Sequence, residues 1–301
     1  MFISRAPDLE NQLYRKESPF VQEVLEAEDI IVSTIPEFRN KERLPIKPKE
    51  KAVNISLNFS VLKDFFECPY RFKMVSMYGF LYPLNRRMGF GKSLHDSLME
   101  LHKRSMLGET IKNDEPIKIA ERQSNFPYMG TSTQLGVMVD LVKSKVSDYY
   151  NKNKESLKTV EFVEQEILLN LDDGILVNGR IDLIRKKLYE DKYETTIIEF
   201  KSEDDPLNCK VTTEQLKLYA LGHKELTGQK ADYIQIYDIK TNTKKAPFVL
   251  EDKHLEETQH KIHFAADEIR NQHFERIDKK EVCTECFQRQ LCSSGIKFIK
   301  K

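Results

Sequence analysis

The chain has 301 residues, of which 40% are hydrophobic, so it is long enough for one large domain or two modest ones around a sizeable core. The 48 Lys and Arg residues equal the 48 Asp and Glu residues, so no overall basic charge points to nucleic acid, although an acidic site can offset basic flanks. No apolar run reaches the ~18 residues of a membrane span and no signal peptide opens the chain, which predicts a cytoplasmic protein without a membrane partner.

Residues 1–50 are predicted to form an N-terminal arm or linker, separate from a domain at residues 51–301. Ser18 and Pro19 give a helix start before Phe20, and residues 33–53 carry three prolines and many charges. Ser18-Pro19-Phe20 resembles a short motif in the tail of the second RecA-like domain of UvrD-type DNA helicases. That resemblance implies the end of a motor domain, and a disordered arm is the alternative.

Helices are predicted over the next hundred residues. Asn58 or Ser60 can cap a short helix, and Pro69 suits the first position of the following one. Residues 89–106 form a helix whose buried stripe is Leu94, Leu98 and Leu101, with His95 and His102 near it. Residues 107–131 are polar and predict a loop, and residues 133–156 again show helical spacing.

The hydrophobic period then changes to that of strands. Three strands are predicted at residues 160–171, 175–184 and 194–200, with a charged loop at residues 185–192. Thr212 can cap a helix at residues 213–226, followed by strands at 231–237 and 246–250 and a polar helix at 252–275.

Two acids and a lysine occupy the ends of neighbouring predicted strands. Asp182 follows a glycine turn in Gly179-Arg180-Ile181-Asp182, and Glu199-Phe200-Lys201 ends the next strand. Side chains alternate along a strand, so Glu199 and Lys201 share one face and Phe200 points into the buried layer. A lone Glu-x-Lys is common at solvated strand ends. Two carboxylates and an amine that converge are typical of a divalent-metal site with a proton-handling group.

Further motifs flank this pair of strands in a fixed order. Gly91 and His95 form a G-x-x-x-H, and Gln215 to Tyr219 form a Q-x-x-x-Y. With Asp182 and the Glu-x-Lys, this order resembles the RecB-like branch of the PD-(D/E)xK nuclease superfamily over about residues 55–297. The resemblance implies an α/β (α+β) fold in which a restriction-endonuclease-like mixed sheet is flanked by helices.

The resemblance also implies roles for the matched residues. His95, Asp182, Glu199 and the Phe200 carbonyl would bind Mg²⁺ or Mn²⁺. Asp182, Glu199 and Lys201 would be the catalytic residues, with Lys201 positioning or activating water.

Three residues are candidates for contact with DNA. By the resemblance, Gln215 and Tyr219 would line the cleft and contact the DNA backbone. Arg180 is a further DNA-binding candidate because it lies inside the Gly-x-x-Asp run. His102 matches no motif position and is expected to be structural.

The five cysteines form a second group of candidate ligands. An odd number of cysteines in a reducing compartment favours ligands or free thiols over disulfides. Four of them could supply thiolates to zinc or to a [4Fe–4S] cluster, and spacing alone does not decide between these: Cys68, Cys283, Cys286 and Cys292. A zinc ribbon usually has two Cys-x-x-Cys pairs, whereas this chain has one.

The sequence around the first of these cysteines favours iron. Cys68-Pro69-Tyr70-Arg71-Phe72 resembles the Cys-Pro-hydrophobic-basic-aromatic box of iron–sulfur, AddB-type RecB-like nucleases. The resemblance implies a [4Fe–4S] staple, held by the four cysteines, that closes the domain by joining its first helices to its last residues. Cys209 lies outside this pattern and is predicted to be a free thiol.

The function implied is that of a Mg²⁺-dependent deoxyribonuclease, an exonuclease on single-stranded DNA. It would act with a UvrD-type helicase motor, in cis or in trans, in DNA repair, recombination or defence. These 301 residues contain no Walker A motif for ATP hydrolysis. The alternative is a catalytically inactive DNA-binding module of the same fold, and the intact Asp182, Glu199 and Lys201 argue against it.

Overall fold

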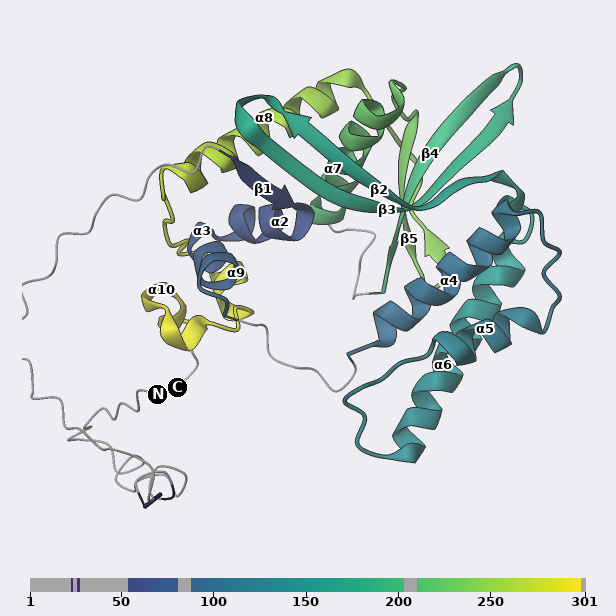
Figure 1. Cartoon of the computed structure of the whole chain (residues 1–301), viewed down its shortest axis with the longest axis horizontal. Helices are drawn as coiled ribbons and strands as arrows, with labels where there is room; N and C mark the ends of the chain where they lie inside the picture. The colour runs from purple at the N-terminus through teal and green to yellow at the C-terminus, as the bar shows by residue number, and fades with distance from the viewer. Residues whose placement is uncertain (1–22, 24–25, 28–53, 81–87, 203–209, 299–301) are drawn as a thin grey trace, which may run out of the picture. The chain divides into compact units, whose positions relative to one another are not determined.

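The structure is a computed structural model of the chain, and it describes residues 23, 26–27, 54–80, 88–202 and 210–298 (Figure 1). It divides into two units, Met1–Glu50 and Lys51–Lys301, and the helices and strands named below belong to the second. The predicted helix start at Ser18, the predicted linker at 33–53 and Cys209 lie outside the described residues.

A mixed sheet forms the centre of the second unit. Within the described residues its order is β1-β3-β4-β5-β6, with β2 beside β3 and β7 beside β5. β1 is parallel to β3 and β4 to β5, and the other pairs are antiparallel, which confirms the predicted mixed sheet. The strands are β1 (Ile55–Asn58), β2 (Val160–Leu171), β3 (Ile175–Tyr189), β4 (Lys192–Lys201), β5 (Tyr233–Asp238), β6 (Thr243–Lys244) and β7 (Phe248–Val249).

Strand β3 changes its partner along one edge. The paired residues of β1 end with Asn58 opposite Asn178, whereas the pairing with β4 runs from Leu183 onward. Residues 179–182 therefore lie between two partner strands on this edge, while β2 pairs along the other edge. We call residues 179–182 the pairing gap. The predicted glycine turn is wrong, because these residues continue β3 as an extended strand.

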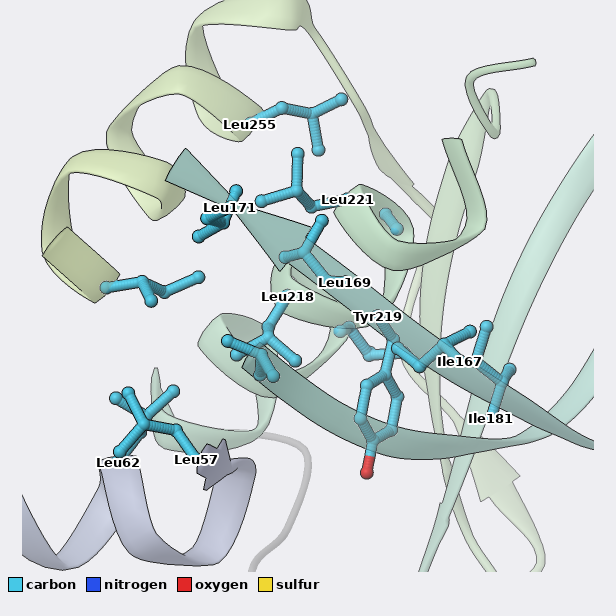
Figure 2. Packing of buried hydrophobic residues seen from close by; sticks show 14 of the residues in the cluster. Leu57, Leu62, Ile167, Leu169, Leu171, Ile181, Leu218, Tyr219, Leu221 and Leu255 are labelled. Atoms are coloured by element: carbon cyan, nitrogen blue, oxygen red, sulfur yellow. The ribbon is translucent and has the colours of Figure 1, made fainter. Parts of the chain in front are cut away.

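Helices cover both faces of the sheet (Figure 1). The helices α4 (Phe90–Met106), α5 (Glu115–Gln123) and α6 (Ser132–Asn153) enclose one core, which includes the predicted stripe of Leu94, Leu98 and Leu101. The other core packs against α2 (Phe59–Glu67), α7 (Lys210–Thr227) and α8 (Asp252–Arg270), and Figure 2 shows its leucines and isoleucines. The shorter helical segments are α3 (Pro69–Phe72), η2 (Lys73–Met77), η3 (Ser156–Thr159), η4 (Asp172–Gly174), α9 (Lys280–Thr284), η6 (Arg289–Leu291) and α10 (Ser293–Ile296).

The predicted helix starts are confirmed in two places and wrong in a third. The Asn58 side chain accepts a hydrogen bond from the N–H of Val61 at 3.0 Å and so caps α2, and Pro69 is the first residue of α3. Thr212 does not cap α7. It lies within that helix, which begins at Lys210, and its side chain is buried, so packing outweighs its preference for a cap.

Two predicted loops contain regular structure. Residues 107–131 include α5, where Ile119 and Ala120 are buried in the core, so packing outweighs the polar composition. The charged run at residues 185–192 instead completes the hairpin of β3 and β4, in which Tyr189 pairs with Lys192. From residue 187 onward its side chains are exposed, so the usual alternation of apolar and polar residues is lost.

No helix within the described ranges is both long and apolar enough to cross a bilayer.

The fully buried His102 anchors the core beneath the candidate site. Its Nε2 lies 2.9 Å from the hydroxyl of Tyr149, which also accepts a hydrogen bond from Arg185. The His102 ring stacks on Phe200 with ring centroids 5.6 Å apart. Burial, together with the charge of Arg185, lowers the pKa of His102 to about 3. This position agrees with the structural role expected for His102.

We predict that His102 makes the domain sensitive to acid. Its pKa falls from an ordinary 6.5 to about 3 on folding, so below pH 6.5 the unfolded chain binds a proton that the folded chain excludes. The contribution of His102 to stability is complete above pH 6.5, and it is lost at up to about 1.4 kcal/mol per pH unit as the pH falls toward 3.

Denaturant unfolding between about pH 7 and about pH 5.5 measures this slope. His102→Gln keeps a hydrogen-bonding side chain but does not titrate. Its free energy of unfolding should therefore depend less steeply on pH than that of the wild type. Parallel slopes in the two proteins would contradict the assignment.

Candidate active site

Asp182 and Glu199 meet at the pairing gap. Oδ2 of Asp182, on β3, accepts the backbone N–H of Phe200 at 2.8 Å, and Glu199 on β4 is only 4% exposed. Phe200 points the other way, into the core of α4 and α6, as the strand alternation predicted. The Asp182 contact therefore holds the two carboxylates beside each other.

Gln215 on α7 joins three of the predicted site residues. Its Nε2 donates to Oε1 of Glu199 at 2.8 Å and to the hydroxyl of Tyr219 at 2.9 Å, and its Oε1 accepts from Nζ of Lys201 at 2.9 Å. Nζ of Lys201 also lies 2.9 Å from Oε1 of Glu199. Residues four apart share a helix face, which is why the Q-x-x-x-Y spacing brings both side chains to one place.

Tyr219 fills the space against the pairing gap. Its ring lies beside Ile167, and its hydroxyl points away from the leucines of the core (Figure 2). A Cβ on Gly179 would lie 2.9 Å from Cε1 of this ring. Gly179 is therefore needed for close approach of a side chain to the strand, and not for a turn. Burial raises the pKa of the Tyr219 hydroxyl, and the charge of Glu199 adds to this effect.

His95 approaches the same point from α4. Its Nδ1 lies 3.6 Å from Oδ2 of Asp182. Gly91, one turn earlier, permits this approach, because a Cβ there would lie 2.8 Å from Oγ of Ser202 at the end of β4. Burial alone would lower the pKa of His95, but the close approach of Asp182 and the charges of Asp182 and Glu199 outweigh it, and the pKa is raised.

The two acids repel each other in a buried setting. Burial raises the pKa of Glu199 to about 8, the charge of Asp182 adds to the rise, and Lys201 opposes it. Oε2 of Glu199 is buried and has no hydrogen-bond partner among the described residues. This buried carboxylate oxygen lacks a described partner and lies beside a second acid. A cation bound there would supply the missing positive charge.

The donor set at this point fits a hard divalent cation. Carboxylate oxygens of Asp182 and Glu199 and the carbonyl of Phe200 are ligands that Mg²⁺ prefers, and this ion keeps several of its waters. In the part of the chain that the structure describes, no three His, Cys, Asp or Glu side chains are grouped closely enough to hold a metal ion. The metal site predicted from the sequence therefore stays a prediction.

Glu164 on β2 belongs to the same neighbourhood and was missed by the sequence analysis. The register pairs its two chain neighbours with Leu183 and Ile181, so Glu164 lies across from Asp182. Its Oε2 is 2.5 Å from Nε of Arg180. Only the register distinguishes Glu164 from the other acids of β2, so no sequence signal could have selected it.

A cleft of about 850 Å³ opens beside these side chains. Its wall includes all three residues that the sequence analysis assigned to DNA: Gln215, Tyr219 and Arg180. The cleft continues to Asn58 and Ser60 at the start of α2. The structure thus brings the predicted DNA-contacting residues to one surface next to the two acids.

The segments that carry the four cysteines proposed as ligands lie around α3 and α9, which are neighbours in Figure 1. The N–H of Tyr70 donates to the carbonyl of Glu275 at 3.3 Å and joins the early segment to the late one. Burial raises the pKa of Cys283, and three further thiols lie near enough to add to the rise: Cys68, Cys292 and Cys286. All four are free thiols that form no metal-holding group, so the predicted cluster is not shown.

Comparison with known protein families matches residues 56–293 to the PD-(D/E)XK nuclease superfamily. The chain belongs to this superfamily. The match contains the acids, the lysine and the histidine of the candidate site, together with the four clustered cysteines. It begins after the Ser18-Pro19-Phe20 segment, so it does not test the likeness of that segment to a helicase.

Solved structures similar to this PD-(D/E)XK chain include a "Putative exonuclease" from Eubacterium rectale and a protein named SSO0001. The first has 12% identity and a TM-score of 0.45, over 82% of this chain and 90% of its own. The second has 13% identity and a TM-score of 0.32, over 78% of this chain and 95% of its own. A search of curated proteins found no match.

We predict that Gly179→Ala disturbs the site while the domain still folds. The added Cβ would force the Tyr219 ring to move and separate its hydroxyl from Gln215. We expect a stability loss of about 1–3 kcal/mol and a fall in the kcat/KM of DNA cleavage of at least ~10-fold. Thermal melting and cleavage of a single-stranded oligonucleotide measure these effects.

Gly136 on α6 provides the matched control. A Cβ at Gly136 meets nothing within 4 Å, so Gly136→Ala should raise stability by about 0.5–1 kcal/mol and leave cleavage unchanged. Wild-type melting and cleavage in Gly179→Ala would show that the approach of Tyr219 to the strand is unimportant.

Proposed function

We propose that this domain is a Mg²⁺-dependent deoxyribonuclease that removes nucleotides from single-stranded DNA. The convergence of Asp182, Glu199 and Lys201 carries the proposal, in a chain of a nuclease superfamily and beside a cleft lined by Gln215 and Tyr219. Phosphodiester hydrolysis needs acids that hold a cation and a group that handles the attacking water, and these residues are of those types.

Each side chain has a separate task in this proposal. Asp182, Glu199 and the Phe200 carbonyl would hold Mg²⁺ or Mn²⁺, and His95, which lies beside Asp182, would be a further ligand. When bound, the ion would polarise the phosphate and lower the pKa of its water. Lys201 is held against the Glu199 carboxylate, where it orients the attacking water and offsets negative charge that develops on the phosphate.

The cleft supports a single strand as the substrate. Duplex DNA is usually held by many cationic contacts along two backbones. The described wall of this cleft offers one cation, Arg180, and one acid, Glu166, together with polar groups of Asn58, Ser60 and Asn178. Exposed apolar side chains of Leu168 and Leu226 also line it and could contact unpaired bases.

A nuclease for single strands needs a source of unwound DNA. We propose that a UvrD-type helicase motor supplies the strand, either in the same polypeptide or as a separate subunit, in repair, recombination or defence. The support is the likeness of Ser18-Pro19-Phe20 to the tail of such a motor.

We predict that Asp182→Asn abolishes cleavage and preserves DNA binding. Asparagine keeps an oxygen that can accept the Phe200 N–H but loses the charge that holds the cation. Cleavage should fall on the order of 10³-fold, whereas binding measured by fluorescence anisotropy in Ca²⁺ should change little. Mg²⁺ and Mn²⁺ should support wild-type cleavage, and Ca²⁺ should not.

Several outcomes would contradict this function. Full cleavage in EDTA would exclude the proposed role of the metal. Binding without any cleavage by the wild type in Mg²⁺ or Mn²⁺ would instead identify a DNA-binding module of the same fold.

We also propose that Cys68, Cys283, Cys286 and Cys292 hold a [4Fe–4S] cluster. Their thiols approach one another at a junction of early and late segments, and a set of four thiolates suits such a cluster or zinc. Arg276 stacks over the Tyr70 ring at 4.2 Å and lies near enough to Cys292 for their charges to interact, which places a positive charge beside the thiols. Positive charge at this position would stabilise thiolate ligands.

We predict that Cys286→Ser loses the metal and destabilises the domain. Anaerobically purified wild type should contain about four iron atoms per chain and absorb broadly near ~400 nm. The variant should lose this absorption and melt at a lower temperature, because cluster assembly joins distant segments. Cys209→Ser is the matched control and should retain the iron. Zinc in place of iron would overturn the cluster assignment, and unchanged melting of Cys286→Ser would overturn the staple.

A further inference from the structure

We propose that Arg180, held in place by Glu164, binds the phosphate next to the scissile one. The site would then engage two successive phosphates of one strand. This inference rests on the proposed nuclease function and adds a substrate requirement to it: a strand with a charged phosphate beside the linkage that is cleaved.

The backbone of β2 is unusual at Glu164. Its φ is 53°, in the left-handed region that residues with a side chain rarely adopt. Among the described residues, the other non-glycine residues with positive φ lie at turns or in the short η4 segment: Asp173, Glu190, Asn242 and Gln272. Glu164 alone among them lies inside a strand. Backbone strain of this kind gathers at functional sites, where the surroundings hold it in place.

The Glu164 carboxylate reaches diagonally across the strand pair. Glu164 lies opposite Asp182, and its partner Arg180 is two residues away on β3, which is the geometry of diagonal neighbours on one sheet face. The Glu164 side chain is 12% exposed and that of Arg180 is 63% exposed. A partly buried carboxylate therefore holds an exposed guanidinium.

The guanidinium keeps donors for a ligand. Arg180 contacts Glu164 through Nε, and in the described part of the chain its two terminal amino groups have no polar partner. Such a planar fork can bind two oxygens of one phosphate at once. Arg180 also lines the cleft that contains Gln215 and Tyr219, so its donors lie on the surface proposed for DNA.

The spacing along β3 matches successive phosphates. Arg180 and Asp182 are two residues apart on β3, so their backbone positions lie about 6.6 Å apart along the strand. This distance is similar to the separation of neighbouring phosphates in an extended nucleic-acid strand. With the scissile phosphate at Asp182, the next phosphate of the DNA strand would lie at Arg180.

The test removes charge from the protein and from the DNA separately. Each single-stranded oligonucleotide in a series carries one uncharged methylphosphonate, placed at a different linkage in each. The products are mapped at single-nucleotide resolution. For the wild type, neutralising the phosphate beside the cleaved linkage should raise KM about 10–100-fold with little change in kcat. Arg180→Ala should raise KM by a similar factor on ordinary DNA and should be insensitive to the methylphosphonate at that position.

Three further variants sharpen the assignment. Arg180→Lys, which has no fork, should recover only part of the lost affinity. Glu164→Gln should raise KM less than Arg180→Ala does and should weaken the effect of the methylphosphonate at the same linkage. Its affinity for Mn²⁺, measured by calorimetry, should equal that of the wild type. Lys187→Ala removes an exposed charge from the hairpin end of β3 and should behave as the wild type in both assays.

The outcomes separate this inference from the proposed function. If the methylphosphonate raises the KM of Arg180→Ala by the same factor as that of the wild type, Arg180 does not contact that phosphate. The inference then fails, while the proposed nuclease function is unaffected. If Glu164→Gln lowers kcat or weakens Mn²⁺ binding, Glu164 acts at the metal and not through Arg180. If the wild type does not cleave, the proposed function fails, and the same comparison by anisotropy in Ca²⁺ still decides whether Arg180 binds that phosphate.

Discussion

The burial of Glu199 beside Asp182 is the constraint on which the candidate site depends. A carboxylate removed from water needs compensating charge and hydrogen bonds, or it becomes protonated. Lys201 and Gln215 satisfy one oxygen of Glu199, and the other has no partner among the described residues. The packing of α7 against the core places Gln215 within reach of both the acid and the lysine.

At the pairing gap, side chains from other elements can reach the buried acids. β1 and β4 both flank β3 on one edge but do not cover residues 179–182, so Tyr219 from α7 fills the space. His95 reaches the same point from α4, and Glu164 reaches it from β2. Each side chain thus comes from a different element, and a small shift of any element would change the arrangement of charges.

The sequence predicts those parts of the site that depend on residues close together in the chain. It does not predict the parts that depend on pairing between distant segments. The alternation of Glu199 and Lys201 and the helical spacing of Gln215 and Tyr219 are local, so their shared faces follow from the sequence. Glu164 becomes recognisable only once the register of β2 against β3 is known. In the same way, α5 and the extended hairpin depend on packing and pairing that no local pattern encodes, and Gly179 resembles a turn residue until the Tyr219 ring is placed against it.

The charges of the site form pairs, and this explains why it would respond to a metal and a strand together. Asp182 faces His95, Glu199 faces Lys201, and Glu164 faces Arg180. A divalent cation bound by Asp182 and Glu199 would relieve the repulsion between these acids and, together with Lys201, would leave more positive than negative charge in a partly buried place. Phosphates of an incoming strand are the natural compensation, and the exposed fork of Arg180 offers one of them a position beside the acids. Metal and substrate would then each increase the affinity for the other, because each one supplies the charge that the other lacks.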